Sequence, residues 1–308
     1  MAQARRRRAG VEQKFSRILC VTKSLSPSQF IMKTNNLKTQ YPELDSVMAK
    51  LAKNLQNVLG ENFVGLYLQG SLVLGDFDLT SDVDFIVVVN KELTEEEVKK
   101  VQYVHTNTYN QDNRWVKRLE YSYFPKNILR KTSSPFPITN DQKNKELWYF
   151  NNGHPTIERS DHCNTLVTRW TVREKGKAVI GPDPKSLIEP ISPNTLRREI
   201  KDTLIGWGEY LLKNPKQYEN RFYQSYLVLN FCRILHDLDK GEISSKLVGI
   251  TWAKVNLDSK WIPLIDYCWE ERKDTSISVK QPAKPEIYKQ SLQFVKYAVE
   301  EGKRYIVN

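Results

Sequence analysis

Two aspartates at alternate positions open the most β-prone run of the chain, and this pattern constrains the fold more than any other feature. Residues 82–89 read DVDFIVVV, and an earlier apolar run at 63–68 ends in the pair Gly70 and Ser71. Side chains alternate between the faces of a strand, so Asp82 and Asp84 project together while their apolar neighbours enter the core. The pattern predicts two strands with a polar site beside them.

The paired aspartates need a partner, because two carboxylates on one face of a strand repel each other. Mg²⁺ is such a partner, since it prefers oxygen ligands together with substrate phosphates. A Gly-Ser turn offers a closely approachable backbone amide at Gly70 and the hydroxyl of Ser71 for phosphate oxygens. The alternative is a set of solvated turn acids at the start of a strand. We predict that Asp82 and Asp84 are metal ligands.

A third carboxylate belongs to a later alternating segment, RWVKRLEYSYF at residues 114–124. Its pattern predicts a strand that has Leu119, Tyr121 and Tyr123 on one face and Arg118, Glu120 and Ser122 on the other. A glutamate in mid-strand is costly to bury without a partner. A metal site or a substrate hydroxyl on the adjacent strand accounts for Glu120, and the alternative is an ion pair with Arg118 or Lys117 at a sheet edge.

The order of the elements predicts an α/β (α+β) domain with a small mixed sheet, followed by an all-α domain. Apolar residues at helical spacing between 44 and 59 precede the strands, and an acid-rich helix follows residue 92. Beyond residue 194 strand signals fade, and we expect helices at 195–213, 220–240, 245–256, 259–272 and 284–306. We expect a disordered basic extension at 1–31, the sheet domain at 32–155 and the helical domain at 156–308.

The net charge of +11 is concentrated at the start of the chain. Residues 1–31 carry +6, including the run from Arg5 to Arg8, so the other 277 residues carry an ordinary +5. The tract can be a disordered tail, an extension upstream of the true start, a ligand for RNA or anionic lipid, or an organellar presequence. We favour the first two interpretations and expect no nucleic-acid partner.

Composition excludes several classes of protein. No run approaches the roughly 18 to 20 consecutive apolar residues of a membrane span, so we expect no membrane association. Cys20, Cys163, Cys232 and Cys268 are scattered without a C-x-x-C pair, and their spacing relative to His154 and His162 fits no zinc pattern. Unpaired thiols favour a reducing, cytoplasmic location. We expect a monomer.

Two predicted helices in the C-terminal half carry polar side chains in positions that favour binding of an anion. On the segment at 223–238, Tyr223 and Arg233 fall on one face, opposite an apolar stripe. Gly241 suits the position after the helix end, and Ser244 or Ser245 suits the next N-cap. Lys246 then lies in a first helical turn, where the helix dipole disfavours a cation, and a bound triphosphate would relieve that conflict.

These motifs together resemble a known superfamily. G-S-x9-S-D-x-D on strands with a later strand glutamate is similar to the polymerase-β-like nucleotidyltransferases, and more closely to the aminoglycoside adenylyltransferases that modify streptomycin and spectinomycin. The segments VIGPDPKSLIEPIS and LVLNFCRILHDLDKGEISSKLVGITWA carry the C-terminal part of the likeness. The resemblance implies a nucleotidyltransferase domain, ATP and magnesium as cofactors, and transfer of AMP to an aminoglycoside hydroxyl in a cleft between two domains, with release of pyrophosphate.

Site residues also follow from the resemblance. Arg233 and Lys246 match ATP-phosphate residues of the family, as do Ser71 and Ser81, and Glu120 would accept the proton of the attacking hydroxyl. The alternatives are a surface pair between Arg233 and Asp237 and a solvated Lys246. The acceptor-binding positions of the family correspond to Trp148, Glu219 and Tyr223. Trp148 can instead be a core residue, and Tyr223 departs from the acidic family pattern.

Two rival functions fit parts of the sequence. The same chemistry could act on another acceptor, either a different antibiotic or an RNA end. A non-catalytic regulator that binds nucleotide or RNA could use Arg5 to Arg8 as its RNA contact. The intact metal and base positions favour an enzyme.

Overall fold

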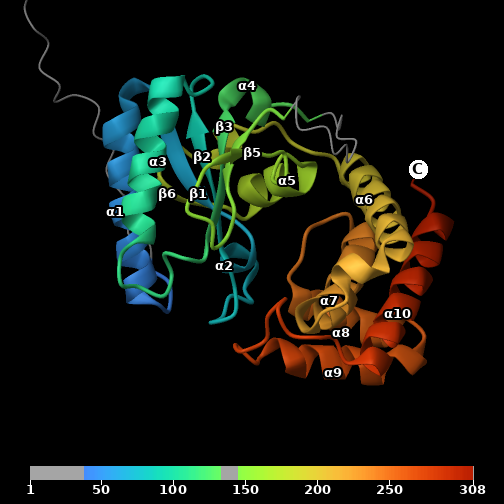
Figure 1. The fold of residues 1–308 in the computed structure, drawn as a ribbon. Coiled ribbons are helices and arrows are strands. Elements are labelled where there is room, and N and C mark those ends of the chain that lie inside the picture. Colours follow the sequence, from blue (N-terminus) through green and yellow to red (C-terminus); the bar gives the residue numbers. More distant parts are fainter. Residues whose placement is uncertain (1–37, 133–144, 308) are drawn as a thin grey trace, which may run out of the picture. The chain divides into compact units, whose positions relative to one another are not determined.

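The computed structural model describes residues 38–132 and 145–307, and residues 32–308 belong to one compact unit. The basic extension predicted at 1–31 lies outside the described residues. Within the unit, the chain builds a sheet flanked by helices and then a group of long helices (Figure 1). The predicted fold class, an α/β nucleotidyltransferase-type domain with a small mixed sheet followed by helices, is confirmed.

The sheet has six strands in the order β5-β4-β3-β2-β1-β6. Only β2 and β3 run parallel among these neighbours, and the other pairs are antiparallel. The parallel register places Asp84 directly beside Glu120. The strands are β1 (Phe63–Leu68), β2 (Val83–Val89), β3 (Leu119–Pro125), β4 (Trp148–Phe150), β5 (Glu158–Arg159) and β6 (Lys177–Ile180).

Helices cover both faces of the sheet. On one face α1 (Pro42–Leu59) and α3 (Glu95–Tyr109) pack against each other and against the strands. α1 presents Leu44, Met48, Leu51 and Leu55 at helical spacing, and all four are buried. α3 starts in a capping box of Thr94 and Glu97. On the other face lie α4 (Lys126–Leu129) and α5 (Leu166–Glu174), with a core formed by alternate residues of β1, β2 and β3.

The sheet differs from the sequence prediction at two places. The strand predicted at 114–124 begins only at Leu119, because Trp115 is buried against Tyr41 and Phe77 in a turn. Strands β5 and β6 follow residue 155, in the part of the chain for which we expected helices, and β6 pairs with β1. The domain boundary itself stays a prediction, but the sheet takes strands from both sides of it.

Five of the long helices form the second part of the unit around a shared apolar core. They are α6 (Pro193–Lys213), α7 (Arg221–Lys240), α8 (Lys246–Asn256), α9 (Ile262–Arg272) and α10 (Pro285–Arg304), close to the predicted ranges. Short 3₁₀ turns occur at Gly60–Asn62, Pro184–Ser186, Pro215–Tyr218 and Ser259–Trp261. Among the described residues, no helix combines the length and apolarity needed to cross a membrane.

The junction of α7 and α8 has the predicted caps. Gly241 ends α7 with φ +69°, and the Ser245 side chain accepts a hydrogen bond from Val248 N–H at the start of α8. At Gly249 a Cβ atom would lie 2.4 Å from the Cα of Arg233, so only glycine permits this approach of the two helices. The close packing fixes Arg233 and the first turn of α8 relative to each other.

Candidate active site

A cavity of about 520 Å³ lies between the polar end of the sheet and the helices α7, α8 and α9. Most of the predicted site residues line it. From the sheet side come Gly70, Ser71, Ser81, Asp82 and Asp84, and from the helical side come Arg233 and Lys246. The structure therefore brings together residues that are up to 176 positions apart in the sequence, from Gly70 to Lys246.

The two aspartates form a strongly acidic spot. Burial, followed by the charge of Glu120, raises the pKa of Asp82 to about 6. Burial and the charges of Glu120 and Asp82 raise the pKa of Asp84 well above its ordinary value. Gly70 has φ +61°, and a Cβ there would lie 2.1 Å from Asp84 Oδ2. The backbone of the Gly-Ser turn is thus packed directly against this carboxylate.

The donor set suits a hard divalent cation shared with a ligand. In the described parts of the chain, no group of three or more His, Cys, Asp or Glu side chains is arranged to hold a metal ion by itself. Mg²⁺ commonly uses only one or two carboxylates and completes its shell with water and substrate phosphates. Two acids whose pKa values are raised by burial and mutual repulsion would be stabilised by such a cation. Asp82 and Asp84 fit that requirement.

Glu120 lies on β3, the strand beside the two aspartates, and its side chain is 14% exposed. Its Oε1 accepts a hydrogen bond from Tyr149 Oη at 2.9 Å and lies 3.3 Å from His162 Nε2. Burial acts to raise the pKa of Glu120, but the bonds from His162 and Tyr149 hold it below its ordinary value. The partners are therefore neither Arg118 nor Lys117, and β3 is an interior strand.

The helical wall of the cavity is cationic. Arg233 donates to Asn230 Oδ1 at 2.8 Å, and the Lys246 ammonium lies 5.4 Å from the ring centre of Tyr226. Burial, together with the charge of Arg233, lowers the pKa of Lys246 to about 8. The backbone N–H of Lys246 donates to Asp76 Oδ2 at 2.9 Å. A carboxylate therefore already occupies the first turn of α8, where the sequence predicted an anion.

The surface pair between Arg233 and Asp237, the alternative to a phosphate-binding role of Arg233, is not formed. Asp237 is buried and accepts hydrogen bonds from the backbone N–H and the hydroxyl of Ser244, at 3.0 and 2.6 Å. Its Oδ1 also lies 3.0 Å from the ring of His236. Asp237 thus organises the turn that leads into α8, while Arg233 points to the cavity.

A contact between the sheet and α9 borders the cavity. Arg272 forms an ion pair with Asp78, and the same guanidinium lies 3.4 Å from the Ser81 hydroxyl. The Ser81 hydroxyl donates to Asp78 Oδ1 and accepts from the Asp78 N–H, both at 3.1 Å. Ser81 lines the cavity, but its hydroxyl is engaged within this turn.

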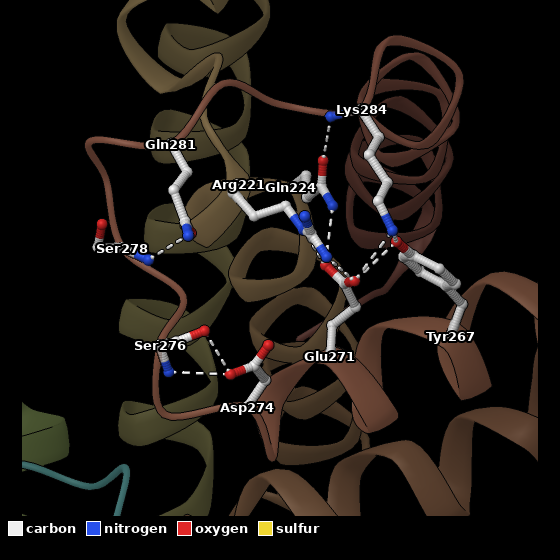
Figure 2. Close-up of polar contacts among 9 residues, drawn as sticks. All are labelled: Arg221, Gln224, Tyr267, Glu271, Asp274, Ser276, Ser278, Gln281 and Lys284. Atoms are coloured by element: carbon white, nitrogen blue, oxygen red, sulfur yellow. Dashed lines mark hydrogen bonds and ion pairs between the residues drawn. The ribbon is translucent and has the colours of Figure 1, made fainter.

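The rim of the cavity at the end of α9 is held by a cluster around Glu271 (Figure 2). Arg221 donates to both carboxylate oxygens of Glu271, and Gln224 and Tyr267 donate at 3.0 and 2.8 Å. Lys284 approaches the same carboxylate at 3.3 Å. Burial acts to raise the pKa of Glu271, but these bonds lower it to about 2. The cluster ties the first turns of α7 and α10 to α9, next to the segment 274–277 of the cavity wall.

The predicted acceptor residues do not line the cavity. Trp148 lies on the opposite face of the sheet from Glu120, where it is half-buried against the core below α1 and α3 and stacks against the guanidinium of Arg159 at 4.2 Å. Glu219 is exposed at the end of a 3₁₀ turn. Tyr223 packs edge-on against Tyr218. Their predicted roles stay predictions, without support from the cavity geometry.

Two family descriptions match the chain over the regions described above. Residues 51–146 match the nucleotidyltransferase domain, and residues 186–300 match the C-terminal domain of aminoglycoside adenylyltransferases. The chain belongs to the aminoglycoside adenylyltransferase family. It is therefore a nucleotidyltransferase enzyme.

Relatives in this family cover most of the chain. A spectinomycin 9-adenylyltransferase of Staphylococcus aureus is 28% identical over 225 residues, which are 70% of this chain and 79% of the relative. An aminoglycoside (3'')(9) adenylyltransferase of Klebsiella pneumoniae is 22% identical over 234 residues, 72% of this chain and 85% of the relative. Spectinomycin adenyltransferase from Enterococcus faecalis, solved with ATP and spectinomycin, has the same fold, with a TM-score of 0.57 and 18% identity over 86% of this chain and all of that chain.

Several cavity residues of this family member were missed by the sequence analysis. Asp76, Asn152, Glu271 and Arg272 line the cavity, and Asn152 donates from its side chain to Asp82 Oδ1. Asp76 lies in the polar GDFDLTS loop between two predicted strands, so its position was a usable signal. Glu271 and Arg272 end a helix without a local motif, and their role is visible only once α9 is placed beside the sheet.

Proposed function

We propose that this protein transfers AMP from ATP to a hydroxyl group of an aminoglycoside-type antibiotic and releases pyrophosphate. The observation that carries the proposal is the pairing of the half-buried acids Asp82 and Asp84 with the half-buried cations Arg233 and Lys246 in one cavity. Such a pair of walls is complementary to a metal ion bound to a triphosphate. The activities named for the relatives from S. aureus and K. pneumoniae support the acceptor class.

Magnesium would be held by Asp82 and Asp84 together with phosphate oxygens. When bound, it supplies positive charge that orients the triphosphate and offsets charge that develops during transfer. The side chain of Asn152 already donates to Asp82, which fixes one carboxylate in place. Gly70 keeps the turn backbone against Asp84, so the second carboxylate is also constrained.

Arg233 and Lys246 would bind the triphosphate from the helical side. Burial, followed by the charge of Arg233, lowers the pKa of Lys246, and a bound polyanion would stabilise the charged form of the lysine. Ser71 and the Gly70 backbone would contact phosphate oxygens from the sheet side. Asp76 accepts the first N–H of α8 and so competes with a phosphate for that position.

Glu120 would act as the general base. In the transfer step the acceptor oxygen forms a bond to the α-phosphorus, the bond from that phosphorus to the pyrophosphate oxygen breaks, and the hydroxyl proton moves to Glu120. The pKa of Glu120 is held below its ordinary value, so the carboxylate is ionised and ready to accept. A glutamine at this position keeps the shape of the side chain and removes the function.

The acceptor would occupy the part of the cavity lined by Phe222, Tyr226 and Asp274. Aromatic rings offer apolar surface to a sugar or cyclitol ring, and Asp274 offers a negative charge to an ammonium group. Trp148, Glu219 and Tyr223 remain as acceptor residues suggested by the family alone. We also propose that the enzyme acts as a monomer in the cytoplasm, with the division at 31/32 and 155/156 as its working domain limits.

Pyrophosphate release by the purified protein with ATP, Mg²⁺ and a panel of aminoglycosides tests the proposal. We expect release with at least one member of the panel and a product that carries AMP by mass spectrometry. Glu120→Gln should bind ATP with the parent affinity in calorimetry and lose turnover, because only proton acceptance is removed. A collapse of ATP affinity would instead make Glu120 a metal ligand or a structural residue.

Two outcomes would contradict the proposal. If no aminoglycoside stimulates pyrophosphate release but an RNA end or another antibiotic becomes labelled from ATP, the chemistry stands and the acceptor is wrong. If no acceptor is labelled and RNA binds in a salt-sensitive manner that is lost when residues 1–31 are removed, the regulator hypothesis replaces the enzyme.

A further inference from the structure

The carboxylate of Glu120 is held in an asymmetric way. Two contacts reach the same oxygen, Oε1, from Tyr149 Oη at 2.9 Å and from His162 Nε2 at 3.3 Å. Within the described residues, Oε2 has no hydrogen-bond partner. Hydrogen bonds to an ionised acceptor are stronger than neutral ones, so two donors on one oxygen restrain the rotation of the group. The free oxygen is thereby left in a fixed position.

The two donors come from different elements. Tyr149 is a buried residue of β4, which pairs with β3 beyond Glu120, and its hydroxyl also lies 3.3 Å from Asn151 Oδ1. His162 lies in the turn between β5 and α5, with 65% of its side chain exposed. The rings of Tyr149 and His162 are 5.6 Å apart. Tyr149 provides the rigid contact, and His162 closes the carboxylate from the solvent side.

We infer that Tyr149 and His162 are positioning residues for proton transfer, which hold Oε1 of Glu120 so that Oε2 receives the proton of the acceptor hydroxyl. The inference rests on the proposed function of Glu120 as the base. His162 can donate from Nε2 in its cationic form and in its neutral Nε2–H tautomer, so the arrangement needs no change of protonation.

The geometry has a direct consequence for the transfer step. When the proton arrives at Oε2, Oε1 becomes the carbonyl oxygen of a carboxylic acid and remains a hydrogen-bond acceptor. The bonds from Tyr149 and His162 therefore persist before and after the transfer, and no donor has to reorient. Site groups that need no rearrangement during the reaction lower its barrier more than mobile ones.

The test compares kcat and KM of three variants with the parent enzyme, in the same pyrophosphate-release reaction. Tyr149→Phe and His162→Ala each remove one donor, and His162→Gln keeps an N–H group near the position of Nε2. We expect the first two to lower kcat roughly tenfold with both KM values within about twofold of the parent. His162→Gln should recover most of the lost kcat, because the donor and not the imidazole is required.

Matched controls separate positioning from folding. Tyr103→Phe alters an exposed tyrosine of α3, and His154→Ala alters an exposed histidine that uses its backbone carbonyl rather than its ring as a partner. Both should retain the parent kcat. Melting temperatures of all variants are measured, and a lowered kcat counts only where the fraction folded at the assay temperature is unchanged.

Glu120→Gln in the same series separates this inference from the function on which it rests. Parent-like kcat for both Tyr149→Phe and His162→Ala, while Glu120→Gln is inactive, would overturn the positioning role and leave the base in place. Equal loss in His162→Gln and His162→Ala would also overturn the role of the donor. Parent-like turnover by Glu120→Gln would remove the base itself, and with it the proposed step.

Discussion

The two walls of the cavity carry opposite charges, yet on both walls the pKa values are shifted toward the neutral form of the side chain. On the sheet wall, burial and mutual repulsion raise the pKa values of Asp82 and Asp84. On the helical wall, burial and a neighbouring cation lower the pKa of Lys246. In each case the environment disfavours the charged form that binding would require. The comparison indicates a ligand that carries both signs, a cation for one wall and a polyanion for the other.

Removal of charge from the sheet wall should have the largest effect. We expect Asp84→Asn to lower turnover by about a thousandfold or more, because it removes a metal ligand, while the melting temperature stays the same or rises since a repelled buried charge is lost. Asp82→Asn should behave alike. Asp112→Asn, at an exposed position, serves as the control. Near-normal turnover of either cavity variant would contradict the assignment of that aspartate as a metal ligand.

Loss of the cation on the opposite wall should weaken binding rather than the chemical step. Lys246→Ala is expected to raise the Kd for ATP roughly 10- to 100-fold, because a charge-assisted contact to phosphate is lost. If ATP bridges the walls before the acceptor binds, the acceptor's apparent affinity should fall too. Calorimetry on a Glu120→Gln background, with and without ATP and Mg²⁺, measures both. Lys240→Ala, at an exposed pair with Asp239, is the control.

An acceptor affinity that is the same with and without nucleotide would contradict the bridging interpretation. The two walls would then bind their ligands independently, even if the chemistry were as proposed.

The pH dependence of ATP binding tests the helical wall without a mutation that removes a charged side chain. The pKa of Lys246 is about 8 in the free protein, and the triphosphate binds its cationic form. The affinity for ATP should therefore fall as the pH rises from about 7 through 8, by up to about tenfold per pH unit. Titration calorimetry between pH 6.5 and about 9.5 measures this fall. Lys246→Arg should flatten it, and a fall of equal size in that variant would assign the titration elsewhere.

The helical wall also depends on the Glu271 cluster, where the expected effect is smaller. Glu271→Gln should lower the free energy of unfolding by about 1 to 3 kcal/mol and raise the KM for the acceptor a few-fold, because the rim segment 274–277 loses its anchor. The pKa of Glu271 is depressed to about 2, so its stabilisation is present above about pH 4.5 and is lost as the pH falls toward 2. Denaturant unfolding at pH 7 and pH 3 measures the free energy of unfolding and its pH dependence, and steady-state kinetics measure the KM for the acceptor.

The neighbouring variant Glu270→Gln alters an exposed residue paired with Lys273 and should change neither quantity. A Glu271 variant with parent stability at pH 7 would show that the cluster does not support the rim.

The smallest effect is expected from the removal of residues 1–31. Among the described residues, those that line the cavity all lie at position 70 or later, so we expect neither wall to change. Activity and melting temperature of the shortened chain should match those of the full chain. A large fall in melting temperature would show that the basic segment packs on the enzyme.

The sheet wall could be predicted from the sequence, whereas the helical wall could be predicted only in part. Asp82, Asp84 and the Gly-Ser turn lie within 15 residues of one another, and strand alternation is enough to place their side chains together. For Arg233 and Lys246, the apolar stripe at 223–238 and the cap residues that follow it predicted the helices on which the two cations lie. The ion pair of Arg272 with Asp78 joins residues 194 positions apart, and no local pattern reports such a contact.

Trp148 illustrates how one residue of strand register decides a role. Its neighbour Tyr149 lies on the face of Glu120 and bonds to it, while Trp148 lies on the other face. The sequence shows the aromatic patch, but it does not show which of these side chains point to which face of the sheet, because β4 is only three residues long. The short strands β5 and β6 escaped prediction for the same reason, since tertiary pairing defines them.

The position of β6 also determines when, during synthesis of the chain, the sheet can be completed at β1. β1 lies between β2 and β6, so one edge of this apolar strand has no partner until residues 177–180 have left the ribosome. That is about 110 residues after β1 itself, or roughly 5 to 20 seconds at ordinary rates of translation. During this interval the nascent chain carries an exposed edge that can pair with other strands. Yield in the cell should therefore depend on how quickly the ribosome passes this stretch and on chaperones that cover the waiting edge.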